Sequence, residues 1–461
     1  MTATSPTPDP NIPHLLLLNL GPAQANLVRT TLSDRIIGSL VASALGDAIG
    51  LYTEFFTAAR ARSAYPAAKF TLHPTPTAFY PDRHRCVHDS GEWTDDTDHS
   101  LLLLLSFLHS GSLPTQKDLA QRLRVWVSNG LLALDSPPLG LGALVGAVVR
   151  TSDFEENPEG AARAQWEKMG KQAAPNGAVM RTHPLGLMMA LREEEQEAFE
   201  LAREMACTTH VDPRCVVSCV IATGLVRACV RGEVVSEGDV DQLIERGKAW
   251  YNRSVGEAEV DWAELDRHLN PQDGLDGLKL DENGKIGYTY KALGCGVVCL
   301  RMAIKRLAQA RGGVLVEREK LFEELITELT MRAGDADTNA CVAGGILGAF
   351  LGYGALPGHW KYGLKHGDWL MKKAEDFCIA LGVMDGVYTA GEDPDTAIYA
   401  GKAALTKDED EMRWMKLSAE TQTRITKLGA EREEEAAASR PNKGLIKSVI
   451  DGLVKKKSKS P

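Results

Sequence analysis

Two short acidic segments, far apart in the chain, carry the residue types best suited to bind a metal ion. Thr94-Asp95-Asp96 and Asp335-Ala336-Asp337-Thr338 each place carboxylates and hydroxyls directly before an apolar, helix-like run. Carboxylates this close together repel one another, and a cation relieves that repulsion. Oxygen ligands without a nearby His or Cys favour Mg²⁺, Mn²⁺ or Ca²⁺ over Zn²⁺. Either segment alone could be a helix N-terminus capped by Asp and Thr, but the same chemistry before two helices favours a shared metal site.

Helices are the elements predicted to position these acidic segments. Residues 33–50 and the run that follows Asp337 both carry a small residue at every fourth position. The stripes are Gly38, Ala42, Gly46 and Gly50 in the first run, and Ala340, Gly344, Gly348 and Gly352 in the second. A glycine inside a helix costs up to about 1 kcal/mol relative to alanine, so a stripe of glycines needs a compensating contact. We expect both stripes to pack against helices in the core of one bundle.

The rest of the chain shows helical periodicity with few convincing strands, which predicts an all-α protein. Two regions depart from this pattern. Residues 71–88, rich in Pro and His, predict a surface loop, and residues 262–287 predict an irregular insertion. Further helices are expected at residues 99–109, 116–127, 143–149, 185–191, 196–206, 213–230, 239–252, 291–310, 317–332 and 360–381.

The composition is typical of a globular protein without a membrane span. The 461 residues are 44% hydrophobic, which is enough for a large core. The net charge of −10 disfavours direct nucleic-acid binding. The longest apolar run, residues 340–356, is shorter than the roughly 20 residues that cross a bilayer, so we expect a buried helix there. Nine cysteines without a Cys-x-x-Cys motif predict core packing and a reducing, intracellular environment.

The predicted domain organisation is one large domain between two extensions. Residues 1–30 begin with a stretch rich in Pro, Thr and Ser and are expected to be disordered. Residues 31–402 form the domain, and residues 403–461 form a charged C-terminal extension. Residues 443–460 mix apolar residues with lysines and are expected to be a solvated tail. The alternatives are a basic amphipathic helix that contacts a partner or an anionic membrane, and a nuclear-import signal, so we expect a cytoplasmic protein that could also enter the nucleus.

Five segments occur in an order that is specific for one family. They are Gly46–Gly50 with Glu54-Phe55, Gly91–Thr97, Asn176–Gly186, Thr209-His210 with Pro213, and Gly334–Thr338 with the small-residue helix that follows. In type, order and spacing they resemble the ADP-ribosylglycohydrolase family, all-α enzymes that include dinitrogenase-reductase-activating glycohydrolase. The resemblance spans about residues 33–401 and implies an orthogonal multi-helix bundle.

The resemblance also implies a site for two Mg²⁺ or Mn²⁺ ions. The family's metal ligands correspond to Thr94, Asp95, Asp96, Asp335, Asp337 and Thr338. Two ions roughly 4 Å apart need a bridging carboxylate, and Asp337 is the natural bridge. The family's ADP-ribose site corresponds to Asn176, Gly177, Met180, Arg181 and His210. For His210 the alternative is a capping or core histidine, and Asp47 is expected either at the metal site or as a helix cap.

The implied activity is hydrolysis of the C1″ glycosidic bond of ADP-ribosyl groups on proteins. The candidate catalytic residues are Asp95, Asp96, Asp335 and Glu54. Either Glu54 or a metal-ligating aspartate would act as the acid or base. The partner would be an ADP-ribosylated protein or a small molecule that contains ADP-ribose. Two alternatives stay open: a hydrolase of a free ADP-ribose metabolite, and a non-catalytic ADP-ribose-binding or crystallin-like member.

Overall fold

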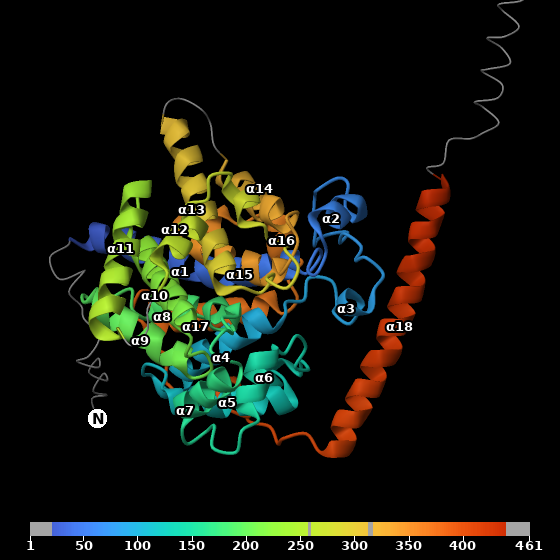
Figure 1. Cartoon of the computed structure of the whole chain (residues 1–461), viewed down its shortest axis with the longest axis horizontal. Helices are drawn as coiled ribbons and strands as arrows, with labels where there is room; N and C mark the ends of the chain where they lie inside the picture. Colours follow the sequence, from blue (N-terminus) through green and yellow to red (C-terminus); the bar gives the residue numbers. More distant parts are fainter. Residues whose placement is uncertain (1–20, 257–259, 312–316, 439–461) are drawn as a thin grey trace, which may run out of the picture. The chain divides into compact units, whose positions relative to one another are not determined.

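The computed structural model describes residues 21–256, 260–311 and 317–438, and these residues are helical with short connections (Figure 1). Among them, β-pairing is limited to two isolated bridges, Leu131 with Ser136 and Pro175 with Tyr288. The predicted all-α fold is therefore confirmed. The N-terminal stretch rich in Pro, Thr and Ser and the basic C-terminal tail lie outside the described residues.

The chain divides into two compact units, residues 1–77 with 90–407 and residues 78–89 with 408–461. The α-helices of the first unit are α1 (Pro22–Gly50), α2 (Ala58–Ala64), α4 (Asp95–Ser110), α5 (Gln116–Asn129), α6 (Ala143–Val149), α7 (Pro158–Lys168), α8 (His183–Met188), α9 (Glu195–Cys207), α10 (Pro213–Arg231), α11 (Glu237–Ser254), α12 (Trp262–Leu269), α13 (Thr289–Arg311), α14 (Arg318–Thr330), α15 (Ala336–Leu351), α16 (Gly358–Lys361) and α17 (Gly367–Ala380). Its 3₁₀ helices are η2 (Leu132–Leu134), η3 (Asn176–Arg181), η4 (Gly274–Leu278), η5 (Tyr353–Ala355) and η6 (Pro394–Thr396).

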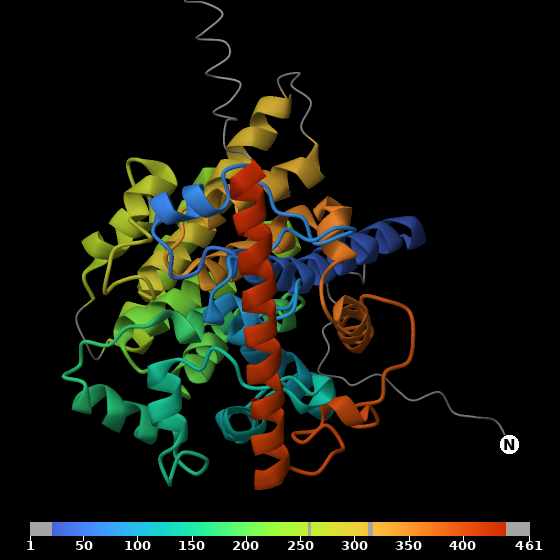
Figure 2. The same cartoon turned by 90° about the vertical axis from the view of Figure 1, so that its right-hand side faces the viewer.

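The second unit contains α3 (Arg83–Cys86) and α18 (Lys407–Ala438), a long helix drawn in red in Figure 2. The charged sequence of α18 favours a helix because opposite charges recur four residues apart, as in Lys427 and Glu431 at 3.9 Å. Arg424 anchors the helix by donating to the carbonyl oxygen of His88 at 2.9 Å and by pairing with Asp89.

The centre of the first unit is an antiparallel pair of helices, α1 and α15 (Figure 1). Their small residues meet so closely that a Cβ atom on the glycine would overlap the opposite carbonyl oxygen. These approaches are Gly46 to Ala340, Gly344 to Ala42, and Gly348 to Gly38. The expected packing of both stripes in the core is confirmed. Because the helices run in opposite directions, the C-terminal end of α1 lies beside the N-terminal end of α15.

Other helices surround this pair. α13, α14 and α10 pack on α15, and α17 packs on α1. Among the described residues, α10 is long and apolar enough to cross a membrane, but 89% of its apolar window is buried inside the protein, which is typical of a core helix. All nine cysteines are free and buried, in agreement with the predicted core packing.

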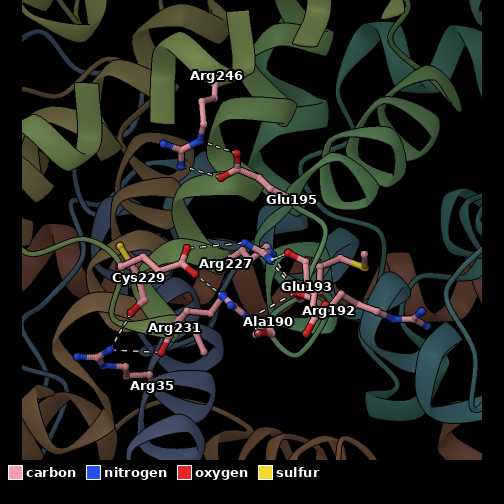
Figure 3. Close-up of polar contacts among 12 residues, drawn as sticks. Arg35, Ala190, Arg192, Glu193, Glu195, Arg227, Cys229, Arg231 and Arg246 are labelled. Carbon is pink, nitrogen blue, oxygen red and sulfur yellow. Dashed lines mark hydrogen bonds and ion pairs between the residues drawn. The ribbon is translucent and has the colours of Figure 1, made fainter. Parts of the chain in front are cut away.

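Arginines hold the C-terminal end of α10 against the turn between α8 and α9 (Figure 3). Arg227 donates to the carbonyl oxygens of Met189 at 3.1 Å and Glu193 at 2.8 Å. Arg35 on α1 donates to the carbonyl oxygen of Cys229 at 2.9 Å. Arg227 therefore links α10 to the α8–α9 turn, and Arg35 links α10 to α1.

Three boundaries differ from the sequence-based expectation. Residues 22–30 were expected to be disordered, yet they belong to α1, because Pro22 suits the first helical position and the Gly21 N–H donates to the Gln24 side chain at 3.1 Å. Residues 262–287 contain α12 and η4 rather than an irregular insertion. The helix expected over residues 360–381 is broken between α16 and α17.

The break before α17 is imposed by tertiary packing. A Cβ atom on Gly363 would overlap the backbone of Leu72. The Lys365 N–H donates to the carbonyl oxygen of Gly91 at 2.8 Å, and His366 adopts a φ of 61°, which an α-helix does not allow. The hydrogen bond from Lys365 to Gly91 also fixes the loop that leads into the first acidic segment.

Candidate metal centre

The two acidic segments meet where three helix ends converge. Packing of α1 on α15 brings Gly50 against the backbone of Ala336 and Asp337. The N-terminus of α4 joins them, and carboxylate oxygens of Asp47, Asp96 and Asp337 lie within 4.8 Å of one another. The expected convergence of the segments is present in the structure.

Asp337 also belongs to a second acidic group. Oxygen atoms of Glu54, Asp335 and Asp337 lie within 4.8 Å of one another. A carboxylate that is common to two such groups can bridge two cations about 4 Å apart. Asp337 therefore has the position that a bridging ligand requires.

Asp47 caps α4 from a different helix. Its carboxylate accepts the backbone N–H groups of Thr94 and Thr97, each at 3.0 Å, and their hydroxyl groups at 2.8 and 2.6 Å. These N–H groups have no partner inside α4, and the Thr94 side chain makes no cap bond of its own. Burial raises the pKa of Asp47 to about 6, although these hydrogen bonds lower it. Asp47 is thus a helix cap that also lies within the acidic cluster.

The threonines of both segments bind the carboxylates. The Thr94 hydroxyl lies 2.8 Å from Asp47 Oδ1 and 3.0 Å from Asp96 Oδ2. A hydroxyl group has one proton, so it can donate to only one of these carboxylates at a time. When it donates to Asp47, its lone pairs face Asp96 and can bind a cation there. The Thr338 N–H donates to Asp337 at 2.8 Å. The Thr338 side chain also lowers the pKa of Asp96 in the first segment and of Asp335 in the second.

The carboxylates of the centre are buried and repel one another. Burial raises the pKa of Asp95 and of Asp96 well above the usual range, and neighbouring carboxylates raise both further. The pKa of Asp337 is also raised well above its usual range, first by burial and then by Glu54, Asp96 and Asp335. Such shifts mean that the charged forms lack a compensating positive charge.

The residues present fit a hard divalent cation. All candidate ligand atoms are oxygens, which Mg²⁺ and Mn²⁺ prefer. Among the described residues, Asp96 Oδ1 is buried without a hydrogen-bond partner. Glu54 lies close to Asp337 and raises the pKa of Asp337. A cation would bind the unpaired oxygen and offset the mutual repulsion of these carboxylates.

Of the residues expected at the ADP-ribose site, Asn176 is the one hydrogen-bonded to the acidic cluster. Its side-chain N–H donates to Asp335 Oδ2 at 2.8 Å, and its backbone N–H donates to the carbonyl oxygen of Gly287 at 3.0 Å. A Cβ atom on Gly287 would lie 3.1 Å from Asp335 Oδ2. Gly177 follows at the start of η3, where a Cβ atom would lie 3.2 Å from the His210 ring.

Met180 and Arg181, at the end of η3, and His210 are buried in the protein interior. Arg181 donates to the Thr209 hydroxyl at 2.7 Å and to the carbonyl oxygen of Met205 at 3.2 Å. The Thr209 hydroxyl also lies 2.8 Å from His210 Nδ1. Burial lowers the pKa of His210 to about 3, and Arg181 lowers it further, so the imidazole is neutral. All of these contacts are with other groups of the protein. A contact of Met180, Arg181 and His210 with ADP-ribose stays a prediction.

Sequence reasoning missed Gly140, which lies against the predicted ligand Asp95. Gly140 has a φ of 87°, and a Cβ atom on it would overlap Asp95 Oδ1. The backbone of the loop before α6 therefore reaches the acidic centre. The feature of the sequence that could have identified this loop is Pro137-Pro138 followed by two glycines. This pattern predicts a tight loop, but it does not predict that the loop contacts Asp95.

Asp98 is a second missed residue. Its two carboxylate oxygens accept the indole N–H groups of Trp93 and Trp126, each at 2.9 Å. Burial raises the pKa of Asp98 to about 7, while these two bonds lower it. Asp98 thus fixes the first turn of α4 against α5, one turn after the predicted ligands.

Similarity to known proteins extends over most of the chain. Residues 28–392 match the family model described as ADP-ribosylglycohydrolase. An uncharacterized protein of Archaeoglobus fulgidus is 25% identical over 343 residues, which cover 74% of this chain and 95% of the relative. The ADP-ribosyl-[dinitrogen reductase] glycohydrolase of Rhodospirillum rubrum is 23% identical over 329 residues, which cover 71% of this chain and 89% of the relative. A solved structure of an ADP-ribosylglycohydrolase-related protein complex is 22% identical, with a TM-score of 0.48, and covers 76% of this chain and 98% of that one.

Proposed function

The chain belongs to the ADP-ribosylglycohydrolase family, and from this premise we propose that it removes ADP-ribosyl groups from proteins by hydrolysing their C1″ glycosidic bond with two Mg²⁺ or Mn²⁺ ions. The observation that carries the proposal is the pair of acidic groups that share Asp337. The printed name of the Rhodospirillum rubrum relative, which refers to a modified dinitrogen reductase, supports a protein-linked substrate.

The ions would be held by the two acidic segments. The residues that would hold them are Thr94, Asp95, Asp96, Asp335, Asp337 and Thr338, of which Asp337 belongs to both acidic groups. When bound, the ions supply positive charge that orients ribose hydroxyls and favours the deprotonation of water. Asp47 stabilises the first acidic segment, because its hydrogen bonds hold Thr94 and Thr97 in place.

The carboxylates account for the chemistry of bond cleavage. Breaking the C1″ bond builds positive oxocarbenium character on the ribose, which nearby carboxylates stabilise. A water molecule gives its proton to a carboxylate and its oxygen to C1″, while the leaving group departs with the bonding electrons and takes up a proton. Glu54 is proposed as the acid or base, since its carboxylate lies within 4.8 Å of those of Asp335 and Asp337. Asp95, Asp96 and Asp335 are the other candidates.

Asn176 and Gly177 are proposed to bind the ADP-ribosyl group. Asn176 is oriented by Asp335 at 2.8 Å, and Gly177 has no side chain, which lets the His210 ring lie close to its backbone. Backbone N–H groups in such a loop can bind phosphate oxygens. Arg181 donates to Thr209 and Met205, which ties the end of η3 to α9 and the turn after it. Contact of Met180, Arg181 and His210 with ADP-ribose stays a prediction.

The test is turnover of defined substrates by the purified protein after chelation and reloading with Mn²⁺. The panel contains protein ADP-ribosylated on arginine, protein ADP-ribosylated on serine, and O-acetyl-ADP-ribose. Asp337→Ala should lower kcat by about 10³-fold or more and abolish Mn²⁺ binding. Asp385→Ala is the matched control, because its side chain is 98% exposed.

Each outcome of the panel decides between the candidate functions. Release of ADP-ribose from modified protein supports the proposal. Turnover of O-acetyl-ADP-ribose alone would replace it with a metabolite hydrolase. Tight ADP-ribose binding without any turnover would indicate a non-catalytic binder, and full activity of metal-free Asp337→Ala would refute the metal mechanism.

A further inference from the structure

The turn that carries Glu54 is bonded directly to the second acidic segment. The Phe55 N–H donates to the carbonyl oxygen of Gly334 at 2.6 Å. In return, the Gly334 N–H donates to the carbonyl oxygen of Phe56 at 3.1 Å. These two bonds hold Glu54 beside the residue that immediately precedes Asp335.

The backbone of this turn is strained. Phe55 has a φ of 59°, a left-handed conformation that is unfavourable for a bulky residue. Such conformations persist only where the surroundings hold them in place, and they concentrate at functional sites. The Thr53 hydroxyl makes one further contact that holds this turn in place: it donates to the carbonyl oxygen of Thr330 at 2.5 Å.

Residues 279–288 pack behind both turns. A Cβ atom on Gly334 would overlap the carbonyl oxygen of Leu280, so this segment lies directly against the second acidic turn. Lys291 fixes the start of the segment by donating to the carbonyl oxygen of Lys279 at 2.6 Å. The start of the segment is thereby tied to α13.

Asp281 connects this segment to the Glu54 turn. The Ala58 N–H, at the first position of α2, donates to Asp281 Oδ2 at 2.8 Å. The local cap of α2 is Thr57, which accepts the Arg60 N–H at 3.2 Å and leaves the Ala58 N–H for Asp281. The end of the Glu54 turn is thereby bonded to a segment that is 223 positions away in sequence.

We propose that Asp281 is a positioning residue that holds the Glu54 turn in its strained conformation, so that the Glu54 carboxyl group stays beside Asp337 and the substrate. This role rests on the proposed hydrolase function. Asp281 acts through the Ala58 N–H and the backbone of residues 53–58 and does not contact the reacting atoms. The segment that contains Asp281 would then contribute to catalysis through the acid or base.

Two readouts on the Mn²⁺-loaded full-length protein test this role. The first is amide hydrogen exchange in peptides that cover residues 53–58. Asp281→Ala should speed exchange there about 10-fold, with no change in peptides that cover residues 94–97. The second is kinetics on ADP-ribosylated protein, where kcat should fall about 5- to 10-fold with little change in KM.

Three further variants separate positioning from general stability. Asp281→Asn keeps a side-chain oxygen acceptor and should restore exchange and kcat. Asp273→Ala removes an exposed carboxylate from the preceding turn and should leave both unchanged. In a Glu54→Gln background, Asp281→Ala should cause no further loss of kcat, because residues that act through one group are not additive.

The proposal is overturned by unchanged exchange in Asp281→Ala, by unchanged kcat when exchange is faster, or by a full additional loss in the Glu54→Gln background. Failure of Asp281→Asn to restore kcat also overturns it. A wild-type protein that turns over no ADP-ribosyl substrate refutes the proposed function, and the exchange result then still decides whether Asp281 holds the turn.

Discussion

Asp47 on α1 binds Thr97 on α4 twice, through the backbone N–H at 3.0 Å and through the hydroxyl at 2.6 Å. With the two matching bonds to Thr94, this single carboxylate both caps α4 and fixes the first acidic segment. The stability of α4 and the geometry of the candidate metal centre therefore depend on the same residue.

Asp47→Ala should destabilise the protein even without metal. The substitution leaves buried N–H and hydroxyl groups unpaired, and we expect a loss of about 2–4 kcal/mol in the free energy of unfolding. Asp47→Asn keeps one acceptor oxygen and should lose roughly half as much. Urea unfolding in excess chelator measures both, and an unchanged midpoint in Asp47→Ala would contradict the cap assignment.

Metal binding should reverse the effect of Asp337→Asn on the stability of the protein. In the apo protein the carboxylates repel one another, so Asp337→Asn at pH 8 should raise stability by about 1 kcal/mol. In saturating Mn²⁺ the wild type should gain about 2.7 kcal/mol at 100 times the dissociation constant, and the variant should gain almost nothing. Thermal unfolding with chelator and with Mn²⁺ measures this crossover, which a purely structural carboxylate would not show.

Gly46→Ala should increase the distance between α1 and α15 and destabilise the protein. A Cβ atom at position 46 would overlap the carbonyl oxygen of Ala340, and we expect a loss of about 2–4 kcal/mol in the free energy of unfolding. Because Asp47 and Asp337 lie at this contact, Mn²⁺ affinity should fall as well. Gly429→Ala on α18 is the control: a Cβ atom there meets nothing within 4 Å, so the same change should stabilise by up to about 1 kcal/mol.

His183 should contribute a measurable pH dependence of stability. Burial lowers its pKa to about 3, although the Met180 backbone raises it, and Ser43 Oγ lies 3.4 Å from Nδ1. Below its ordinary value of 6.5 the unfolded chain binds a proton that the folded protein does not. Stability is therefore fully present above that pH and falls by about 1.4 kcal/mol per unit as the pH drops toward 3.

His183→Gln removes this titration. The difference in unfolding free energy between wild type and variant should change with pH below 6.5 and stay constant above pH 7. Urea unfolding of both proteins at half-unit intervals from pH 8 to pH 5 provides the measurement. Parallel curves over the whole range would show that His183 is not held neutral.

Several features could be predicted from sequence because they depend on short stretches of chain. The acidic residues 94–96 and 335–338 stand next to apolar helical runs, so they lie at helix N-termini. The glycine stripe of α15 follows from spacing alone, since residues four apart share one face of a helix. The long helix α18 carries the same local signal in its charges, yet its extent had not been expected.

Other contacts arise only from long-range packing. Nothing local predicts that Gly140 meets Asp95, that Trp93 and Trp126 share Asp98, or that Asp281 caps α2. The broken helix at residues 362–366 has the same origin, because contacts with Leu72 and Gly91 override its helical periodicity.

The amino-acid sequence alone determined the helical class, the acidic residues of the candidate metal centre and the small residues that allow two helix backbones to touch, since each follows from residue type and helical period. The tertiary structure decided that α1 and α15 run antiparallel, which brings Asp47 and Glu54 to Asp337. Residue spacing along a helix specifies a face, but the direction and partner of that face depend on the packing of the whole core.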